Sequence, residues 1–416
     1  MAADREIVVT GLGVVSPIGI GVDPFWRSLS GGTSGVALCG SLPELGPRLA
    51  AEVRDFNPLE YVTPRKSLKV MARDSQLALA AARLAREHAG IGPNAVDPDR
   101  LASVFGADTI NPLIEDSAQT YGPCMVEGKF HFDRWQEHGM PRTFPLNMLK
   151  LLPNMLTCHV SIAHDARGPC NTTYQGDVSS ALAISESASL IERGMADVVL
   201  TGGASSRLQP LDWLRHRLAY ELSARIDEPE HASRPFDRHR AGQVPGEGAG
   251  CMVLESAGHA RRRDATVHAR VLGWGSSCDV PADRPGAGLV RAIHKALARA
   301  ALNAGDIDFV FAHAAGTREH DPIEAQAISD ALPKAHVTAL KSYFGNLFAA
   351  GGTIETIAAV LALGRGAVPA TLNYRSPDPA CPVRVLREPS PEGPRRVLVL
   401  GRTPLGQATA LVLAAA

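Results

Sequence analysis

The chain has 416 residues, of which 42 are Lys or Arg and 43 are Asp or Glu, so its formal net charge is −1. A protein that binds the phosphate backbone of a nucleic acid usually carries an excess of positive charge, which this chain lacks. We therefore expect no nucleic-acid partner. Hydrophobic residues make up 45% and charged residues 20% of the chain, values typical of a well-packed globular protein. The length allows two or three structural units that share one large core.

Seven cysteines are scattered through the chain without a Cys-x-x-Cys pair. This pattern predicts reduced thiols in a cytoplasmic protein and no zinc site. The first residues contain no apolar core of signal-peptide length. The most apolar stretch, residues 351–370, is interrupted by Glu355, Arg365 and several glycines, so we expect no membrane span.

Short β-branched runs alternate with long helical patterns, which predicts an α/β fold. The pattern predicts, in chain order, a strand at 7–11, helices at 69–90 and 178–194, strands at 197–203 and 251–256, a helix at 289–305, a strand at 309–313, a helix at 353–363 and strands at 395–401 and 409–413. The charged segment 257–265 is either a linker or a solvated turn. We therefore predict two α/β halves, residues 1–256 and 257–416.

The run GLGVVS at residues 11–16 begins like a dinucleotide-binding fingerprint. Ser16 stands in place of the third glycine, and no acidic residue follows at the expected distance. We interpret this run as a tight turn after a strand and expect no nucleotide cofactor.

The segment 168–203 predicts an extended approach, a sharp turn at Gly176 and Asp177, a helix of small residues and a strand. A residue at this turn lies at the positive end of a helix dipole, where a thiolate or an oxyanion would be stabilised. The alternative is that Asp177 is only the helix N-cap and accepts the backbone N–H of Ser179 or Ser180.

Four segments of the chain resemble the β-ketoacyl-acyl-carrier-protein synthases. They are IVVTGLGVVSPIG (7–19), RPFDRHRAGQVPGEGAG (234–250), FAHAAGTREHDPIEAQAI (311–328) and KSYFGNLFAAGGTIE (341–355). The resemblance covers essentially the whole chain and implies the thiolase-like, five-layered αβαβα fold of two similar halves. Condensing members of this family carry a nucleophilic cysteine at the turn before the helix and two histidines, one in a His-Gly-Thr motif and one in a Lys-Ser-x-x-Gly-His motif.

The chain departs from the family around the catalytic positions. A gapless match of GPCNTTYQGDVSSALAI puts Asp177 in place of the nucleophilic cysteine. A carboxylate does not hold an acyl group stably, because the product would be a mixed anhydride more reactive than the thioester. Asn346 replaces the second histidine, while His313 is retained but is followed by Ala314 and Ala315. We therefore expect no condensation, and His313 is alternatively a hydrogen-bonded core histidine.

Two further residues match family positions that support the active site. These are Lys341 and Glu355, which are alternatively a buried ion pair retained for folding.

Cys170 lies seven residues before Asp177 and is a possible substitute nucleophile. It precedes the turn, so we expect a small buried core residue instead.

The resemblance also points to the walls and the gate of the acyl pocket. The family's Gly-Phe-Gly-Gly gate is replaced by Thr403, Pro404, Leu405 and Gly406, and the proline argues against a mobile gate. Gln243 stands where the family usually has an aromatic residue near the acyl chamber. By position, Tyr174, Gln175 and Gln243 are candidates for filling the pocket.

A ketosynthase scaffold without its nucleophile most resembles the chain-length factor of type II polyketide synthases. The resemblance implies a heterodimer with an active ketosynthase, a tunnel for a polyketide or polyene chain near the interface, an acyl carrier protein that reaches the complex, and no cofactor or metal.

Two alternatives remain open. One is a repurposed enzyme in which Asp177 and His313 form an acid–base pair for hydrolysis, cyclisation or dehydration of a carrier-bound chain. A carboxylate at a helix N-terminus should have a lowered pKa, which counts against that role. The other alternative is a self-associating scaffold without a ketosynthase partner.

Overall fold

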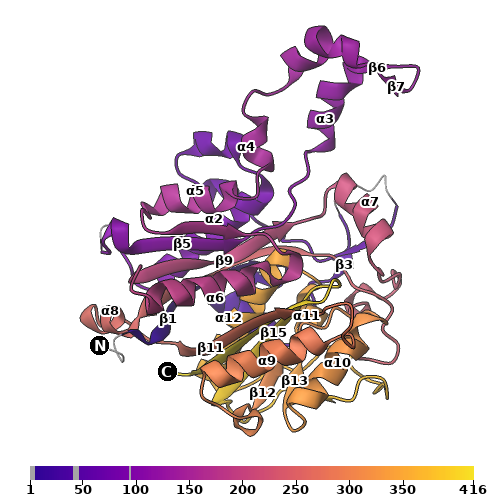
Figure 1. Cartoon of the computed structure of the whole chain (residues 1–416). Coiled ribbons are helices and arrows are strands. Elements are labelled where there is room, and N and C mark those ends of the chain that lie inside the picture. The colour runs from indigo at the N-terminus through magenta and orange to yellow at the C-terminus, as the bar shows by residue number, and fades with distance from the viewer. Residues whose placement is uncertain (1–4, 41–45, 93–94) are drawn as a thin grey trace.

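The computed structural model describes residues 5–40, 46–92 and 95–416. Within these residues, twelve strands form one continuous sheet in the order β14-β13-β12-β15-β16-β11-β1-β10-β9-β5-β8, with β2 beside β1 (Figure 1). Strands β1 (Ile7–Ser16) and β11 (Ala269–Cys278) pair only from Ile7 to Val9. This short seam divides the sheet into an N-terminal and a C-terminal half-sheet.

The two half-sheets repeat one topology. The N-terminal half-sheet contains β1, β2 (Gly19–Ile20), β5 (Leu101–Gly106), β8 (Cys170–Thr173), β9 (Val198–Ser206) and β10 (Glu247–Ser256). The C-terminal half-sheet contains β11, β12 (Phe309–Phe311), β13 (His336–Thr338), β14 (Arg384–Val385), β15 (Arg396–Arg402) and β16 (Gln407–Ala415). Both place their five main strands in the order third, second, fourth, fifth, first. This repeat supports the division at residues 256 and 257, which we keep as a proposal.

Helices complete a five-layered arrangement, as predicted (Figure 1). The middle layer is formed by α6 (Ser179–Glu192) and α12 (Gly351–Arg365), which contact each other and both half-sheets. The outer layers are formed by α2 (Arg73–His88) and α5 (Met155–His164) on the N-terminal half, and by α9 (Ala287–Arg299) and α10 (His320–Ala331) on the C-terminal half. The remaining α-helices and short strands include α1 (Val22–Ser30), β3 (Ala37–Leu38), β4 (Leu49–Ala50), α7 (Pro210–Ala219), α8 (Ala257–Arg262) and α11 (Lys341–Phe344).

The position of α12 explains its composition. A helix that is apolar on every side belongs in a protein core or in a membrane. Among the described residues, one segment, Phe348–Arg365, is long and apolar enough to cross a membrane, and 89% of it is buried inside the protein. This segment ends in α12, between the two half-sheets, and is therefore a core helix.

The GLGVVS run is strand, not the predicted turn. Strand β1 continues through it to Ser16. Helix α2 packs directly on this strand, so a Cβ atom on Gly13 would lie 2.0 Å from the Ala81 carbonyl oxygen. The glycines in this run permit close packing of a helix on a strand rather than a change of chain direction.

Residues 110–154, here called the arm, project from the N-terminal half (Figure 1). The arm contains α3 (Ile114–Tyr121), β6 (Met125–Val126), β7 (Lys129–Phe130) and α4 (Asn147–Leu151). Tyr121, Phe130 and Trp135 cluster in its outer part, with ring centroids 5.5 to 6.5 Å apart. The sequence analysis did not predict this arm.

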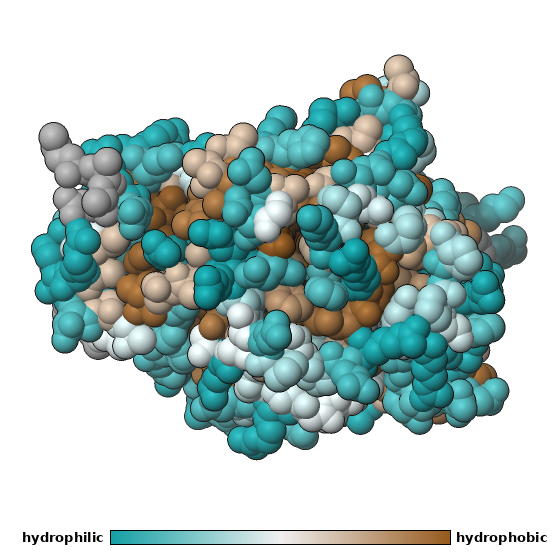
Figure 2. Space-filling model, turned by 90° about the horizontal axis from the view of Figure 1, so that it is seen from below, coloured by the Kyte–Doolittle hydropathy of each residue, from teal (hydrophilic) through white to brown (hydrophobic). Residues whose placement is uncertain are grey.

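The arm exposes many large apolar side chains: Leu113, Ile114, Tyr121, Met125, Val126, Phe130, Phe132, Met140, Phe144, Leu146, Met148 and Leu152. Phe132 is 77% exposed and Met148 is 66% exposed. Figure 2 shows the molecule from below, where hydrophilic residues form the rim and apolar residues appear between them toward the centre. A concentration of exposed apolar groups on a projecting segment marks a surface for contact with another molecule.

Candidate functional site

Asp177 lies in a tight turn that leads into α6. Gly176 has φ +60°, a conformation that favours glycine, and residues 176–178 form a single 3₁₀ turn. The Ser179 hydroxyl closes this turn by accepting the Gln175 N–H at 2.8 Å and donating to the Gly176 carbonyl at 2.7 Å. The cap position of α6 is Val178, without a side-chain cap. The N-cap interpretation of Asp177 is therefore wrong, because its carboxylate turns into the protein.

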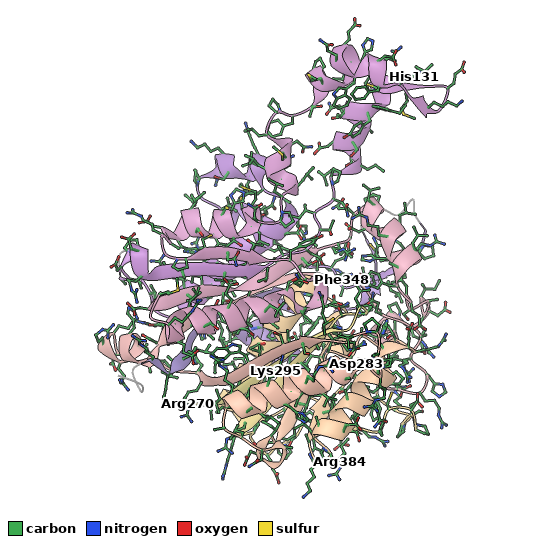
Figure 3. The ribbon with its side chains drawn as sticks, in the orientation of Figure 1. His131, Arg270, Asp283, Lys295, Phe348 and Arg384 are labelled. Atoms are coloured by element: carbon green, nitrogen blue, oxygen red, sulfur yellow. The ribbon has the colours of Figure 1, made fainter. Side chains whose placement is uncertain are left out.

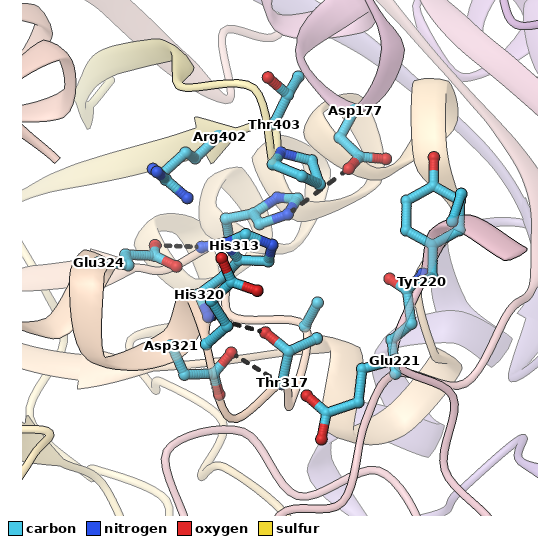
Figure 4. Close-up of a pocket in the computed structure, with 15 residues that line it drawn as sticks. Asp177, Tyr220, Glu221, His313, Thr317, His320, Asp321, Glu324, Arg402 and Thr403 are labelled. Atoms are coloured by element: carbon cyan, nitrogen blue, oxygen red, sulfur yellow. Dashed lines mark hydrogen bonds and ion pairs between the residues drawn. The ribbon is translucent and has the colours of Figure 1, made fainter. Parts of the chain in front are cut away.

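The carboxylate of Asp177 faces His313 and Asn346. Its Oδ2 lies 3.8 Å from His313 Nε2 (Figure 4), and the Asn346 amide hydrogen-bonds to it. The same amide donates to Gln243 Oε1 at 2.9 Å, and Asn346 Oδ1 accepts the Phe348 N–H at 3.2 Å. The fold thus brings Asp177, His313, Asn346 and Gln243 together.

Lys341 and Glu355 lie on the other side of His313. Lys341 Nζ is 3.2 Å from His313 Nδ1 and 2.5 Å from Glu355 Oε1. Both charged side chains are 1% exposed. A buried ammonium between a carboxylate and an imidazole is held in place by both partners, so this arrangement fixes the imidazole ring.

Glu324 of α10 fixes the backbone at His313. Its two carboxylate oxygens accept the N–H groups of His313 and Ala314, each at 2.8 Å (Figure 4). The sequence analysis did not single out Glu324, although it lies in the motif DPIEAQAI. Glu324 lies eleven residues after His313, and the two come into contact only because the chain reverses direction between β12 and α10. The sequence alone does not show this reversal.

The protonation states follow from burial. Burial lowers the pKa of His313 well below its usual range, and the Lys341 ammonium lowers that pKa further. Because this ammonium donates to Nδ1, we assign the ring hydrogen of neutral His313 to Nε2, the atom nearest Asp177.

Burial raises the pKa of Asp177 to about 6, and Lys341 opposes this rise. The predicted lowering of the pKa of Asp177 is wrong, because loss of water at this position outweighs the favourable charges and dipoles around it. Near neutral pH the carboxylate is largely ionised, yet it can still take up a proton.

The cavity in front of Asp177 is small, about 90 Å³. Ligand pockets are usually at least about 300 Å³, so this space holds a few water molecules and not an acyl chain. Its walls include residues that the sequence analysis did not single out: Tyr220, Glu221, Thr317, His320, Asp321 and Arg402 (Figure 4). They come from three segments that are far apart in the sequence: the end of α7, the start of α10 with the loop before it, and the end of β15.

An aromatic and ionic cluster fills the space beside the Asp177 turn. Phe348, in the segment that packs on residues 176–178, has φ +47° and is 1% exposed. Its ring stacks on His216 with centroids 5.1 Å apart, and the Arg207 guanidinium lies 4.8 Å from it. Arg207 is also 3.6 Å from both Asp108 and Asp212. Buried charges and aromatic rings therefore pack together on this side of the Asp177 turn.

Of the three candidates for filling the pocket, only Gln243 lies at the site. The Tyr174 side chain is 50% exposed and its hydroxyl contacts Thr109. Gln175 Oε1 accepts a hydrogen bond from Gln407 Nε2 at 2.6 Å, near the surface. The prediction for Tyr174 and Gln175 is wrong, because the chain turns at Gly176 and directs these side chains away from the cavity.

The predicted gate loop is a closed turn between β15 and β16. The Thr403 N–H donates to the Gln407 carbonyl at 2.9 Å, and the Gly406 N–H donates to the Thr403 carbonyl at 3.0 Å. Thr403 and Pro404 line the cavity, whereas Leu405 is 86% exposed. Gly406 has φ +86° and packs against Asp279.

Cys170 is exposed, not buried as predicted. It begins β8, which is the last strand of the sheet and pairs only with β5 among the described strands. Its Sγ lies 3.3 Å from Ser161 Oγ on α5. The prediction was wrong because the interior of the sheet could not be distinguished from its edge by sequence.

The chain matches the family description "Beta-ketoacyl synthase, N-terminal domain" over residues 4–260 and "Beta-ketoacyl synthase, C-terminal domain" over residues 268–375. The fold and these matches show that the chain belongs to the β-ketoacyl synthase family, with a thiolase-like fold. It is 33% identical to 3-oxoacyl-(acyl-carrier-protein) synthase 2 of Coxiella burnetii, covering 91% of this chain and 90% of that protein. It is also 33% identical to the tetracenomycin polyketide synthase ketoacyl synthase alpha subunit of Streptomyces glaucescens, covering 91% and 89%.

Solved structures of ketosynthases are also similar to this chain. "The ishigamide ketosynthase/chain length factor" superposes with a TM-score of 0.86 at 29% identity, covering 99% of both chains. A β-ketoacyl synthase from Burkholderia phymatum superposes with a TM-score of 0.88 at 27% identity, and also covers 99% of both chains. A third structure, "AntDE:AntF (apo): type II PKS acyl-carrier protein in complex with its ketosynthase bound to the hexaketide", gives a TM-score of 0.83 at 26% identity, again covering 99% of both chains.

Proposed function

We propose that this chain is a catalytically inactive, ketosynthase-like subunit that pairs with an active ketosynthase and shapes its acyl tunnel in polyketide or polyene biosynthesis. The observation that carries the proposal is Asp177, which stands in the turn where condensing members have their nucleophile. Its carboxylate faces a cavity of only about 90 Å³. Neither a nucleophile nor room for an acyl chain is present at this position.

The N-terminal half offers a surface for the partner subunit. Strand β8 ends the sheet, and its outer edge has no strand beside it among the described residues. Unpaired edges and exposed apolar patches are both favourable places for association. The arm adds apolar side chains to the same half, and Figure 3 shows His131 on the arm at a distance from Phe348 in the centre of the molecule. We propose that the partner covers both the edge of β8 and the arm.

A second cavity, of about 380 Å³, supports a role in shaping the tunnel. It lies at the base of the arm, between residues 110–116, residues 147–151 and the start of α2, and we call it the arm-root cavity. Thr109, directly before it, contacts Tyr174 at the end of β8, so the cavity adjoins the proposed pairing edge. A chain that grows on the partner's nucleophile could extend into this space.

We place the pair in the cytoplasm, which the seven free cysteines support. We propose that an acyl carrier protein serves the complex through the ketosynthase partner. This is supported by the similar AntDE:AntF structure, which is described as a carrier protein in complex with its ketosynthase.

The repurposed enzyme remains a second candidate because of one observation. Asp177, with a pKa of about 6, could accept a proton near neutral pH. Against it, Nδ1 of His313 is occupied by Lys341, and the ring hydrogen on Nε2 makes His313 a donor toward Asp177 rather than a second base.

Co-purification tests the proposal. The chain, carrying a tag, is expressed with the ketosynthase encoded beside it, and the mass of the eluted complex gives its stoichiometry. A stable one-to-one pair is the expected result. A homodimer that leaves the ketosynthase behind contradicts the proposal and favours the enzyme or the self-associating scaffold.

A further inference from the structure

The arm-root cavity has a mouth of mixed apolar and charged side chains and a buried polar end. Leu113 and Leu151 are half-exposed at its arm side. Asp74, at the start of α2, and Ser206, at the end of β9, lie at its buried end and are 4% and 8% exposed. A chain that entered from the arm side would pass Leu113 and Leu151 and end near Asp74.

Asp74 is a buried acid that forms no direct ion pair among the described residues, although its charge raises the pKa of the adjacent Arg73. Its Oδ1 accepts the Ser206 N–H at 2.7 Å, which is the one hydrogen bond it receives from another residue in the described part of the chain. The neighbouring Arg73 is engaged elsewhere, because its guanidinium forms two hydrogen bonds with Glu247, at 2.6 and 2.7 Å.

The charge around Asp74 favours its neutral form. Burial, with a smaller contribution from the nearby carboxylates of Asp108 and Asp212, raises the pKa of Asp74 to about 7, and the hydrogen bond from the Ser206 N–H opposes this rise. At neutral pH this carboxyl group can therefore both donate and accept a hydrogen bond. A carboxyl group that both donates and accepts at the buried end of the cavity suits a neutral ligand that carries a hydroxyl group.

Other polar side chains at the cavity already form hydrogen bonds or ion pairs with the protein. Gln76 donates to the Met71 carbonyl at 3.2 Å, and Asn111 donates to Asp212 at 2.5 Å. Lys150 is 3.5 Å from Asp116 at the mouth. Asp74 is therefore the buried group at this cavity with the most unused hydrogen-bonding capacity toward a ligand.

We propose that the starter end of the growing chain carries a hydroxyl group and that Asp74 hydrogen-bonds to it. This inference rests on the proposed function. A polyketide is extended at its thioester end, so the end formed first is pushed deepest into any tunnel. A methyl group at that end would displace water from Asp74 without offering a hydrogen bond in its place. Binding such an end would therefore cost free energy. A protonated amine would approach Lys69, Arg73 and Lys150, which line the same cavity.

The test is a competition between two primers. The purified pair receives equal amounts of two acyl thioesters of the same length, one ending in a hydroxyl group and the other in a methyl group, and mass spectrometry measures the ratio of the two product series. The wild-type pair should favour the hydroxyl primer by roughly tenfold, the effect of one buried hydrogen-bonding group. Asp74→Leu should reverse the preference, whereas Asp74→Asn should keep most of it.

The control is Asp227→Asn, at an exposed carboxylate that does not line the cavity, which should leave the ratio unchanged. A wild-type pair that shows no preference overturns the inference even if Asp74→Leu fails to fold. Equal ratios for wild type and Asp74→Leu overturn it as well. If the wild-type chain neither binds the ketosynthase nor changes its products, the proposed function fails instead, and the two failures are thus distinguishable.

Discussion

His313 Nε2 lies 3.8 Å from Asp177 Oδ2, and the two side chains are only 11% and 7% exposed. Lys341 holds the opposite nitrogen of the same imidazole at 3.2 Å. The ring is therefore fixed between an ammonium group and a carboxylate. We propose that Asp177 stands where condensing members of the family have their nucleophile, and a carboxylate there cannot hold an acyl group stably.

Restoring a cysteine should not restore condensation. In Asp177→Cys the thiol would face a cavity of about 90 Å³, which is too small for a long chain. We expect no stable acyl-enzyme after incubation with an octanoyl thioester, measured as intact mass. Labelling of the introduced thiol with iodoacetamide serves as the control for access, and stoichiometric acylation would contradict the closed pocket.

The Asp177→Asn variant should be more stable than wild type above pH 6. The pKa of Asp177 is about 6 in the folded protein and 3.8 for the free side chain, so the folded state binds more protons. The contribution of Asp177 to stability is intact below about pH 4 and is lost as the pH rises to about 6. Asn removes this loss, which corresponds to about 2 to 3 kcal/mol at pH 8. Urea unfolding at pH 4.5 and pH 8 measures it, and a gain that is equal at both values would refute the assignment.

The same variant separates the two candidate functions. Asn retains the hydrogen-bonding shape of Asp but cannot accept the proton that an acid–base enzyme needs. In the reconstituted system we expect Asp177→Asn to give wild-type amounts of product. A loss of about 100-fold in turnover would instead identify Asp177 as a catalytic base.

The Lys341–Glu355 ion pair should contribute mainly to folding. Lys341→Met leaves the Glu355 carboxylate buried without its partner, and we expect a loss of about 3 kcal/mol in the free energy of unfolding. The double variant Lys341→Met, Glu355→Gln should recover most of that loss, because no buried charge remains. A double variant that is no more stable than Lys341→Met in urea titrations would show that the pair is not coupled.

The arm should carry much of the interaction with the partner. Met148→Glu places a charge at an apolar side chain that is 66% exposed. We expect the dissociation constant for the ketosynthase to rise at least about tenfold while the unfolding curve of the isolated chain stays the same. Val280→Glu, at an exposed apolar residue of the C-terminal half, is the matched control. If both substitutions weakened binding equally, the arm would not be part of the interface.

The sequence predicted the fold because its patterns are local. The amphipathic run in α2 and the small-residue run in α6 each specify one helix, and the four family motifs specify their arrangement. The seam at Ile7–Val9 and the shared strand order were not visible, because pairing between distant strands depends on contacts that no single segment contains.

The site was predicted unevenly for the same reason. Asp177, His313, Lys341 and Asn346 belong to recognisable motifs, and the fold brings them together. Glu324 lies in a family motif but was not singled out, because its contact with His313 depends on how the chain folds back. Tyr220 and Arg402 belong to none of the quoted motifs. The prediction for Cys170 failed because strand periodicity does not tell an edge strand from a central one.

The most direct test of the central claim is the product of a reconstituted synthase. The ketosynthase, its carrier protein and malonyl units are combined with and without this chain, and the lengths of the products are measured by mass spectrometry. The account predicts that the chain restricts a mixture of short products to one main length without itself becoming acylated. Identical products and rates in its presence and absence would contradict the account.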